Sequence, residues 1–433
     1  DTAPIKMAKL RGRWQLIARD AFNGKLLWKR DIIDWEPIGR PYRTGPTQLH
    51  RRLVAVGDRV FATLQDNGPV TMLDAATGET LRTYEGTEPV QEIIYEEDQL
   101  FLVSGHESPD AIAFSKSGET YFFERSQLYA HDPVQSFRYL KGRDFSGYQC
   151  TIMALDAKTG KILWSQNDLT RGYHGSSLAI SDKYALFQTS QSLTCLDRNT
   201  GEGLWVADQE VIYGKGTKGV HAGSSITVVV SDENEMVYTC HPGAFSIGYA
   251  LKSGEERWRT PVEVVNYHAP PDLFVIGDTI WANDETGYDA KSGKAVARRT
   301  FSFDRPMGHD RCYRARATPQ YIIESKSGGA DFSRLNSDEE FANPWIRGAC
   351  QYGVLPCNGL LYAPPHPSQC ARSSLLAGFY ALAPEREGSS DQRCSDVLEK
   401  GPSSGMTRDS EVIAAGQDEW PTFRHNEDRG SAT

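Results

Sequence analysis

Long apolar runs are missing from this chain of 433 residues, which nowhere has 18 apolar residues in succession. We therefore expect no transmembrane helix, because a helix needs about 20 apolar residues to cross a bilayer. No segment with the pattern of a secretory signal opens the chain, which begins at Asp1, so we expect a processed or trimmed form. Glycine (39) and tyrosine (19) are plentiful instead, which favours short strands joined by tight turns.

Closely spaced cysteines are missing as well. None of the eight cysteines belongs to a C-x-x-C pair, which argues against a cysteine zinc site. An even count permits disulfides, and we expect Cys312 and Cys350, each at the front of a predicted strand, to pair. The net charge of −10 argues against nucleic acid or an anionic membrane as the main partner, although it leaves room for a local basic pocket.

An internal repeat is the strongest feature that the sequence does have. Its units are DAFNGKLLW (20–28), DAATGETLR (74–82), DAKTGKILW (156–164), DRNTGEGLW (197–205), ALKSGEERW (250–258) and DAKSGKAVA (289–297). Asp and Asn or Thr bond their own backbone, and Gly supplies a positive φ, so each unit predicts a turn between two strands. Tryptophans stand four residues after the glycine in four units, where we expect them to pack between neighbouring repeats.

A second hairpin precedes most of these turns, as in RRLVAVGDRVFAT (51–63) and DLFVIGDTIW (272–281). Hairpin and turn together give four antiparallel strands in roughly 40 residues, a period typical of β-propeller blades. The sequence therefore predicts an all-β propeller of four-stranded antiparallel blades, with eight blades counted from the turns and seven as the alternative. A β-solenoid is the competing architecture.

The D-A-x-T-G-x-x-x-W unit resembles the hallmark of the pyrroloquinoline-quinone-like (PQQ-like) repeat propellers, over about residues 14–383. That superfamily includes quinoprotein dehydrogenases and the BamB lipoprotein of outer-membrane assembly, so the resemblance implies a fold rather than one activity. It also implies a secreted or periplasmic location, in an oxidising compartment.

Domain boundaries follow from this repeat. We expect a propeller over 1–383 with an aromatic-rich insert at 105–148, and a tail at 384–433. The first blade shows only its outer two strands, and the tail either closes the ring or leads into a second propeller. The insert interrupts a connection between strands of one blade, and its many Tyr and Phe residues suit a lid or a surface on which sugars stack.

Histidines are distributed unevenly over the two faces of the predicted propeller. If the strands of a blade are named A to D from the axis outward, the D–A and B–C connections share one face, here called the funnel face. The A–B and C–D turns share the other, here called the turn face. Nine of the ten histidines map to the funnel face and only His425, in the tail, does not. They are His50, His174, His221, His268 and His309 ahead of A strands, His106, His241 and His366 after B strands, and His131 in the insert.

We therefore predict that residues suited to catalysis or binding lie close together where the central axis opens on the funnel face. GHDRCYRAR (308–316) places His309, Arg311 and Tyr313 on one side of an extended strand, a set suited to acid–base work and anion binding. The predicted catalytic residues are His221, His268, His309, Arg311 and Tyr313. The predicted substrate-binding residues are His174, His241, His366 and His106, and the candidates for a divalent metal are His174, His221, His268 and His309.

The sequence leaves two main functions open, and it favours an oxidoreductase less than either of them. One is a carbohydrate-active enzyme, a polysaccharide lyase or glycosidase, in which Arg311 neutralises a sugar carboxylate while Tyr313 and His309 or His268 move protons. The histidines could simply bond backbone carbonyls, however, which suits a non-catalytic BamB-like scaffold that binds a protein. A quinone-dependent dehydrogenase fits less well, because such enzymes carry adjacent cysteines over the cofactor and this chain has none. A metal-dependent oxidoreductase built on the histidines completes the alternatives.

Overall fold

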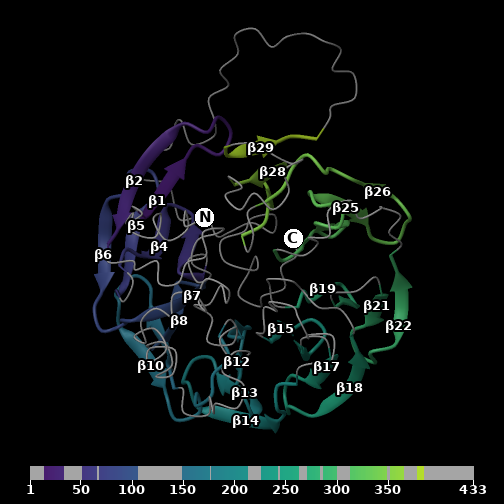
Figure 1. Ribbon diagram of the computed structural model, residues 1–433. Coiled ribbons are helices and arrows are strands. Elements are labelled where there is room, and N and C mark those ends of the chain that lie inside the picture. The colour runs from purple at the N-terminus through teal and green to yellow at the C-terminus, as the bar shows by residue number, and fades with distance from the viewer. Residues whose placement is uncertain are drawn as a thin grey trace, which may run out of the picture.

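The structure is a computed structural model that describes residues 14–33, 51–65, 68–105, 149–175, 177–212, 226–241, 244–262, 271–282, 286–299, 313–348, 352–364 and 378–384. The elements with bounds in these ranges are 29 strands, which form eight antiparallel sheets. The sheets follow one another around a central axis in chain order (Figure 1). The all-β class and the propeller of four-stranded blades are therefore confirmed.

Six sheets have four strands each, paired in chain order. They consist of β3 (Leu53–Val56), β4 (Arg59–Thr63), β5 (Val70–Asp74) and β6 (Thr80–Tyr84); β7 (Val90–Glu96), β8 (Gln99–Ser104), β9 (Thr151–Asp156) and β10 (Ile162–Gln166); β11 (Ala179–Ile180), β12 (Tyr184–Gln188), β13 (Ser192–Asp197) and β14 (Gly203–Asp208); β15 (Thr227–Ser231), β16 (Met236–Cys240), β17 (Phe245–Ala250) and β18 (Glu256–Pro261); β19 (Phe274–Ile276), β20 (Thr279–Trp281), β21 (Thr286–Asp289) and β22 (Ala295–Arg298); and β23 (Arg316–Ala317), β24 (Tyr321–Glu324), β25 (Asp331–Arg334) and β26 (Glu340–Phe341).

Two partial sheets complete the circle. One contains β1 (Trp14–Arg19) and β2 (Leu26–Ile32), and the other contains β27 (Leu355–Cys357), β28 (Leu360–Ala363) and β29 (Tyr380–Leu382). If these two sheets are counted as two blades, the propeller has eight blades. If they are counted as one blade, it has seven. As predicted, the D-A-x-T-G-like turn of the first repeat joins only an outer pair of strands.

The repeated turns form for local reasons. In most units the carboxylate of the leading Asp accepts backbone N–H groups two and three residues on, as Asp197 does from Asn199 and Thr200 at 2.9 Å each. The glycine that follows has a left-handed φ of 65° to 76° in all six units. The predicted role of Asp and Gly in these turns is confirmed.

Tryptophans join four of these turns to the preceding blade. The Trp164 indole donates to the Arg198 carbonyl of the next blade at 2.7 Å, and its ring lies against Gly201. A Cβ on Gly201 would approach that ring to 2.5 Å, so only glycine fits there. The same pairing recurs for Trp28 with Gly78, Trp205 with Gly254 and Trp258 with Gly293, which confirms the predicted packing between repeats.

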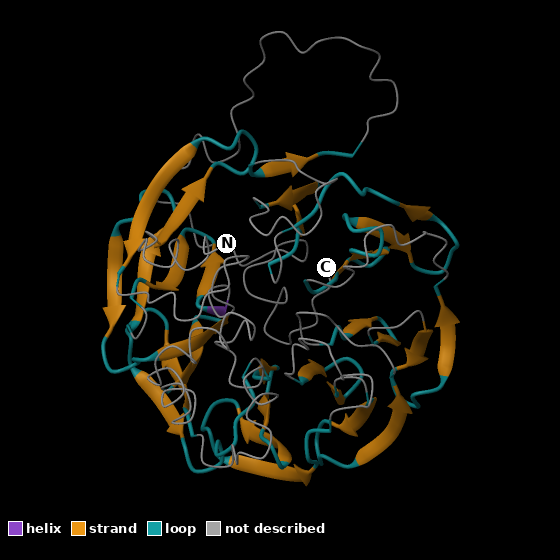
Figure 2. Cartoon of the chain, in the orientation of Figure 1, coloured by secondary structure: helices purple, strands orange, loops and turns teal. Residues whose placement is uncertain are grey.

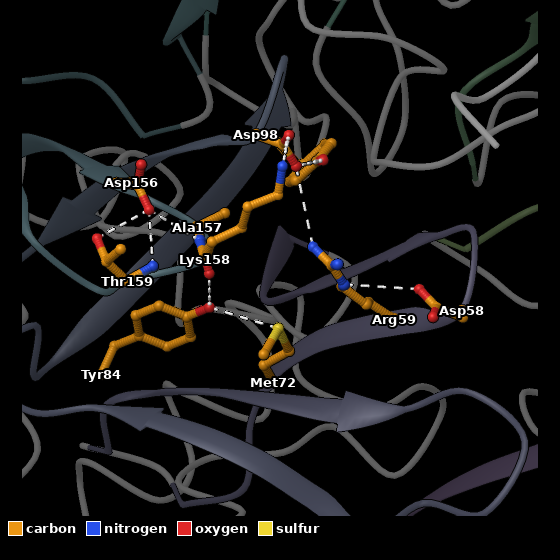
Figure 3. Close-up of polar contacts among 10 residues, drawn as sticks. Asp58, Arg59, Met72, Tyr84, Asp98, Asp156, Ala157, Lys158 and Thr159 are labelled. Carbon is orange, nitrogen blue, oxygen red and sulfur yellow. Dashed lines mark hydrogen bonds and ion pairs between the residues drawn. The ribbon is translucent and has the colours of Figure 1, made fainter. Parts of the chain in front are cut away.

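One blade replaces the tryptophan with a tyrosine. In the DAATGETLR unit the corresponding residue is Arg82, and Tyr84, two residues further along the same strand, packs on Gly160 of the next blade. The Tyr84 hydroxyl donates to the Ala157 carbonyl at 2.5 Å and lies 3.6 Å from the Met72 sulfur (Figure 3). Burial raises the pKa of Tyr84 to about 12, which keeps the phenol protonated as a donor.

Apolar cores lie between consecutive sheets rather than at the axis. Seven buried clusters join the eight sheets in chain order, such as the one that packs Phe101 and Trp164 against Leu178 and Phe187. Each of the six four-stranded sheets buries both of its faces in this way, as radial packing in a propeller requires.

Backbone hydrogen bonds confirm the two faces. On the turn face, each complete blade ties its C–D turn to its A–B turn, as the Ala157 N–H does to the Asp98 carbonyl at 2.8 Å. On the funnel face, D–A connections bond to B–C connections, as the Gln209 N–H does to the Gln191 carbonyl at 2.9 Å. Figure 2 shows the described loops and turns between the strands in teal.

Several sequence-based expectations fall outside the described residues. They include residues 106–148 of the aromatic insert, 385–433 of the tail, and Cys312 and Cys350. Among the described cysteines, Cys150, Cys195 and Cys240 are buried free thiols. The described part of the chain contains no helix that is long and apolar enough to cross a membrane.

Candidate functional site

The funnel face is where the sequence predicted the functional residues, and two of its histidines lie in the described ranges. These are His174, ahead of β11, and His241, directly after β16. The others lie outside the described residues, as does Arg311. They are His50, His106, His131, His221, His268, His309 and His366. The predicted meeting of five A-strand histidines therefore stays a prediction.

Hydrogen bonds of the His174 backbone hold this residue in place. Its N–H donates to the Gln188 carbonyl at 2.9 Å, and its own carbonyl accepts the Ser177 hydroxyl at 2.6 Å. The Nδ1 atom of its partly buried ring is inaccessible and has no hydrogen-bond partner among the described residues. Burial lowers the pKa of His174 to about 4, because the site disfavours a charged imidazolium.

His241 is completely buried and joins two blades. Its Nδ1 accepts the backbone N–H of Ile212 at 3.2 Å, which places the ring proton on Nε2. Its ring packs on Phe245 with centroids 4.6 Å apart, and Nε2 has no partner within the described ranges. Burial, followed by Arg259 and His174, lowers the pKa of His241 to about 3.

Both described imidazoles are therefore neutral at pH 7 and poorly suited to proton transfer. A general acid or base works best with a pKa near the working pH, and these values lie well below it. His174 contributes to the lowered pKa of His241, so the two rings are electrostatic neighbours. Their predicted role in binding a substrate stays a prediction.

Tyr313 is the one predicted catalytic residue that the structure describes. It is 2% exposed, and its hydroxyl donates to the Gly329 carbonyl at 3.0 Å. Its ring lies 6.0 Å from the Arg347 guanidinium and packs on Gly353, where a Cβ would come within 2.9 Å. These contacts fasten the connection ahead of β23 to its neighbours. A proton-transfer role for Tyr313 stays a prediction.

Buried arginines also lie on this face. Arg51 and Arg52 precede β3, and Arg314 and Arg316 stand at β23, all 3% to 8% exposed. Arg52 donates to the Gln91 side chain at 2.6 Å, and Arg316 donates to the Tyr352 carbonyl at 3.1 Å. Burial, followed by Arg314, lowers the pKa of Arg316 to about 10, so it stays a cation at neutral pH.

Of these four arginines, Arg314 contacts the residues that are most distant from it in the sequence. Its Nη2 donates to the Pro271 carbonyl at 2.8 Å and to the Thr227 hydroxyl at 3.3 Å, and its Nε lies 3.4 Å from the Asp272 carboxylate. Burial lowers the pKa of Arg314, and the adjacent Asp272 opposes that shift. The positive charge of Arg51 lowers the pKa of Arg314 as well.

Arg51 and Arg314 are buried cations of the funnel face that sequence reasoning missed. Sequence reasoning chose Arg311 from GHDRCYRAR and passed over Arg314 in the same stretch. The available signal was the position ahead of an A strand, which Arg51 and Arg314 share with the histidines. The sequence could not show that both side chains are buried.

A metal centre is not formed by the described residues, where no three His, Cys, Asp or Glu side chains gather in a way that could hold an ion. The metal candidates His221, His268 and His309 lie outside the described residues. His174 has His241 as its electrostatic neighbour.

Comparisons with known proteins agree with the architecture. A family model described as outer membrane protein assembly factor BamB matches residues 12–299. The computationally designed Ika8 protein is similar in structure with a TM-score of 0.53 at 10% identity, covering 85% of this chain and 90% of that chain. BamB from Moraxella catarrhalis gives a TM-score of 0.43 at 14% identity, covering 83% of this chain and 97% of that chain. No curated protein matches this sequence.

Proposed function

Because the chain belongs to the family of the outer membrane protein assembly factor BamB, we propose that it is a non-catalytic binding propeller whose funnel face holds a protein partner outside the cytoplasm. One observation carries the proposal. The described imidazoles of the funnel face are neutral and buried, with pKa values of about 4 and 3, so they suit structure better than acid–base chemistry.

The rest of the described funnel face agrees with a rigid surface for binding. The Tyr313 hydroxyl is held by the Gly329 carbonyl, and the connection at Gln209 is tied by its N–H to Gln191. A surface whose backbone is already fixed loses little conformational entropy when a partner binds. The apolar cores between the blades supply that rigidity.

Site-specific photo-crosslinking tests the proposal. A photoreactive residue at Gln191, exposed in the B–C turn of the β11–β14 blade, should crosslink to one discrete partner in envelope extracts. The matched control is Asn199, exposed in the C–D turn of the same blade on the turn face, which should not. The purified partner should then bind the wild-type propeller, and a Gln191→Arg variant more weakly. Equal crosslinking from both positions, or no partner, would contradict the proposal.

A carbohydrate-active enzyme is the second candidate, favoured by the cations that the funnel face buries. In it, Arg311 would bind a uronate carboxylate, and one of His268, His309 and Tyr313 would take the adjacent C–H proton. A second of these groups would protonate the glycosidic oxygen as its bond to carbon breaks and a C=C bond forms. His221 would assist, and His174, His241, His366 and His106 would contact the sugar. Incubation with uronate polymers separates the two proposals, because only the lyase produces ultraviolet absorbance from the new double bond.

A further inference from the structure

Two neighbouring blades bury hydrogen-bonding side chains at the funnel-face end of the apolar core between them. Gln188 ends β12 in one blade, and His241 directly follows β16 in the next. Gln188 pairs with Leu193, and Leu193 packs in the core that joins these two blades, so the Gln188 side chain lies on that side of its sheet. Both Gln188 and His241 are 0% exposed.

The connection between the two blades contacts both side chains. Gln188 Nε2 donates to the Gln209 carbonyl at 2.8 Å. Three residues later, the Ile212 N–H donates to His241 Nδ1 at 3.2 Å. A short stretch of backbone therefore holds Gln188 and His241 at one place between the blades.

A second series of contacts surrounds the same place. The Gln209 side-chain carbonyl accepts from Arg259 at 2.7 Å, and the Arg259 guanidinium lies 4.5 Å from the centre of the Phe245 ring. The His241 ring packs on that Phe245 ring, with centroids 4.6 Å apart. These contacts fix the position of His241 relative to the connection that also holds Gln188.

Three buried atoms at this place have no hydrogen-bond partner among the described residues. They are His174 Nδ1, Gln188 Oε1 and His241 Nε2. His174 adjoins Gln188, because its backbone N–H donates to the Gln188 carbonyl at 2.9 Å, and its effect on the pKa of His241 agrees with a nearby ring. Polar atoms buried in this way are usually bonded to an internal water when no protein group reaches them.

The three atoms differ in what they can donate and accept. His241 Nδ1 accepts the Ile212 N–H, so the ring proton is on Nε2, which is a donor. Gln188 uses both of its amide hydrogens on backbone carbonyls, so its Oε1 is an acceptor. His174 Nδ1 accepts or donates according to its tautomer. A nitrogen that carries a proton cannot ligate a metal ion, so this set does not suit a metal.

A water molecule matches these three atoms, because it can donate two hydrogen bonds and accept two. We infer that one internal water molecule is bound between the two blades, where it accepts the His241 Nε2–H and donates to Gln188 Oε1, with His174 Nδ1 as its third partner. This water joins the β11–β14 blade to the β15–β18 blade at the funnel face. It is bound whether or not a protein partner occupies that face.

A high-resolution crystal structure tests for this water directly. Density for one water molecule should lie within about 3.2 Å of both His241 Nε2 and Gln188 Oε1. NMR spectroscopy of histidine-labelled protein gives a second readout, since the His241 ring proton should show a nuclear Overhauser contact with a slowly exchanging water. A direct hydrogen bond between His241 Nε2 and Gln188 Oε1, or the lack of any density between them, would overturn the inference.

A pair of glutamine variants shows whether the named atoms hold the water. Gln188→Met removes the acceptor with a side chain of similar length, so the water density and the NMR contact should both be lost. Gln191→Met is the matched control, because Gln191 is an exposed glutamine in the turn after the same strand, and it should keep both signals. If Gln188→Met does not fold, His174→Phe serves instead, since it removes one partner and should lower the occupancy of the water. An unchanged water in whichever of these two variants folds would also overturn the inference.

Discussion

At the scale of the residue, His241 shows how burial decides what an imidazole can do. A histidine on a loop would ordinarily titrate near pH 6.5, but this ring is completely buried and its pKa is about 3. The unfolded chain therefore takes up a proton at this residue before the folded protein does. Folding stability from this residue is complete above pH 6.5 and is lost as the pH falls from there towards 3.

His241→Asn makes this testable, because the Asn oxygen can replace Nδ1 as acceptor for the Ile212 N–H but does not titrate. Between pH 7 and pH 5 the wild type should lose about 2 kcal/mol more unfolding free energy than the variant. Urea unfolding at both pH values measures the difference, and the shared loss from other groups cancels. Parallel losses in the two proteins would show that His241 titrates normally.

At the scale of the element, the repeated turn and the tryptophan before it act as one latch between blades. Gly201 combines a φ of 72° with a Cβ position only 2.5 Å from the Trp164 ring, whereas Gly24 has a φ of 71° with open space around it. Gly24→Ala should therefore cost about 1 kcal/mol of unfolding free energy from backbone strain alone. Gly201→Ala should cost a further 1–3 kcal/mol, approximately, from overpacking.

Denaturant unfolding of both variants at one pH measures these costs. Trp164→Ala provides the complementary control, because it removes the ring that the new methyl group would strike. In that background Gly201→Ala should cost only as much as Gly24→Ala does. An equal loss for Gly24→Ala and Gly201→Ala in the wild-type background would show that the latch contributes no packing.

At the scale of the whole molecule, the sheets form a ring in which neighbours share apolar cores. A solenoid would lose protection only near a damaged repeat, since its units contact their neighbours in one open row. In a ring, loosening one interface should affect all the blades. Trp258→Ala, between the β15–β18 and β19–β22 blades, should raise amide exchange in every complete blade by a similar factor.

Hydrogen exchange followed by proteolysis and mass spectrometry measures this spread. Leu81→Ala is the matched control, because Leu81 is half exposed on the outermost strand and contributes little to a core. It should leave the exchange pattern unchanged. Faster exchange confined to β15–β22 in the Trp258→Ala protein would indicate the independent units of an open array.

The sequence by itself determined the strands, the turns and the order of the blades. Asp197 and Gly201 act on their own backbone within a few residues, so their effect can be recognised wherever the motif recurs. The tryptophan at a fixed place after each glycine likewise indicated a contact between repeats. In the DAATGETLR unit, where tryptophan is missing, the structure was needed to show that Tyr84 takes its place.

Only the tertiary structure decided the chemistry of the funnel face. Repeats show which residues stand ahead of an A strand, and that knowledge placed His174 and the stretch 308–316, which contains Arg314, on one face. Whether a side chain there is buried, charged or paired depends on residues from other blades, as with Arg314 and Thr227. Ring closure brings such residues together, and burial then suppresses the charge of His174 while Arg314 keeps its partner Asp272. The sequence therefore identified the face, and the fold decided which of its groups are cations.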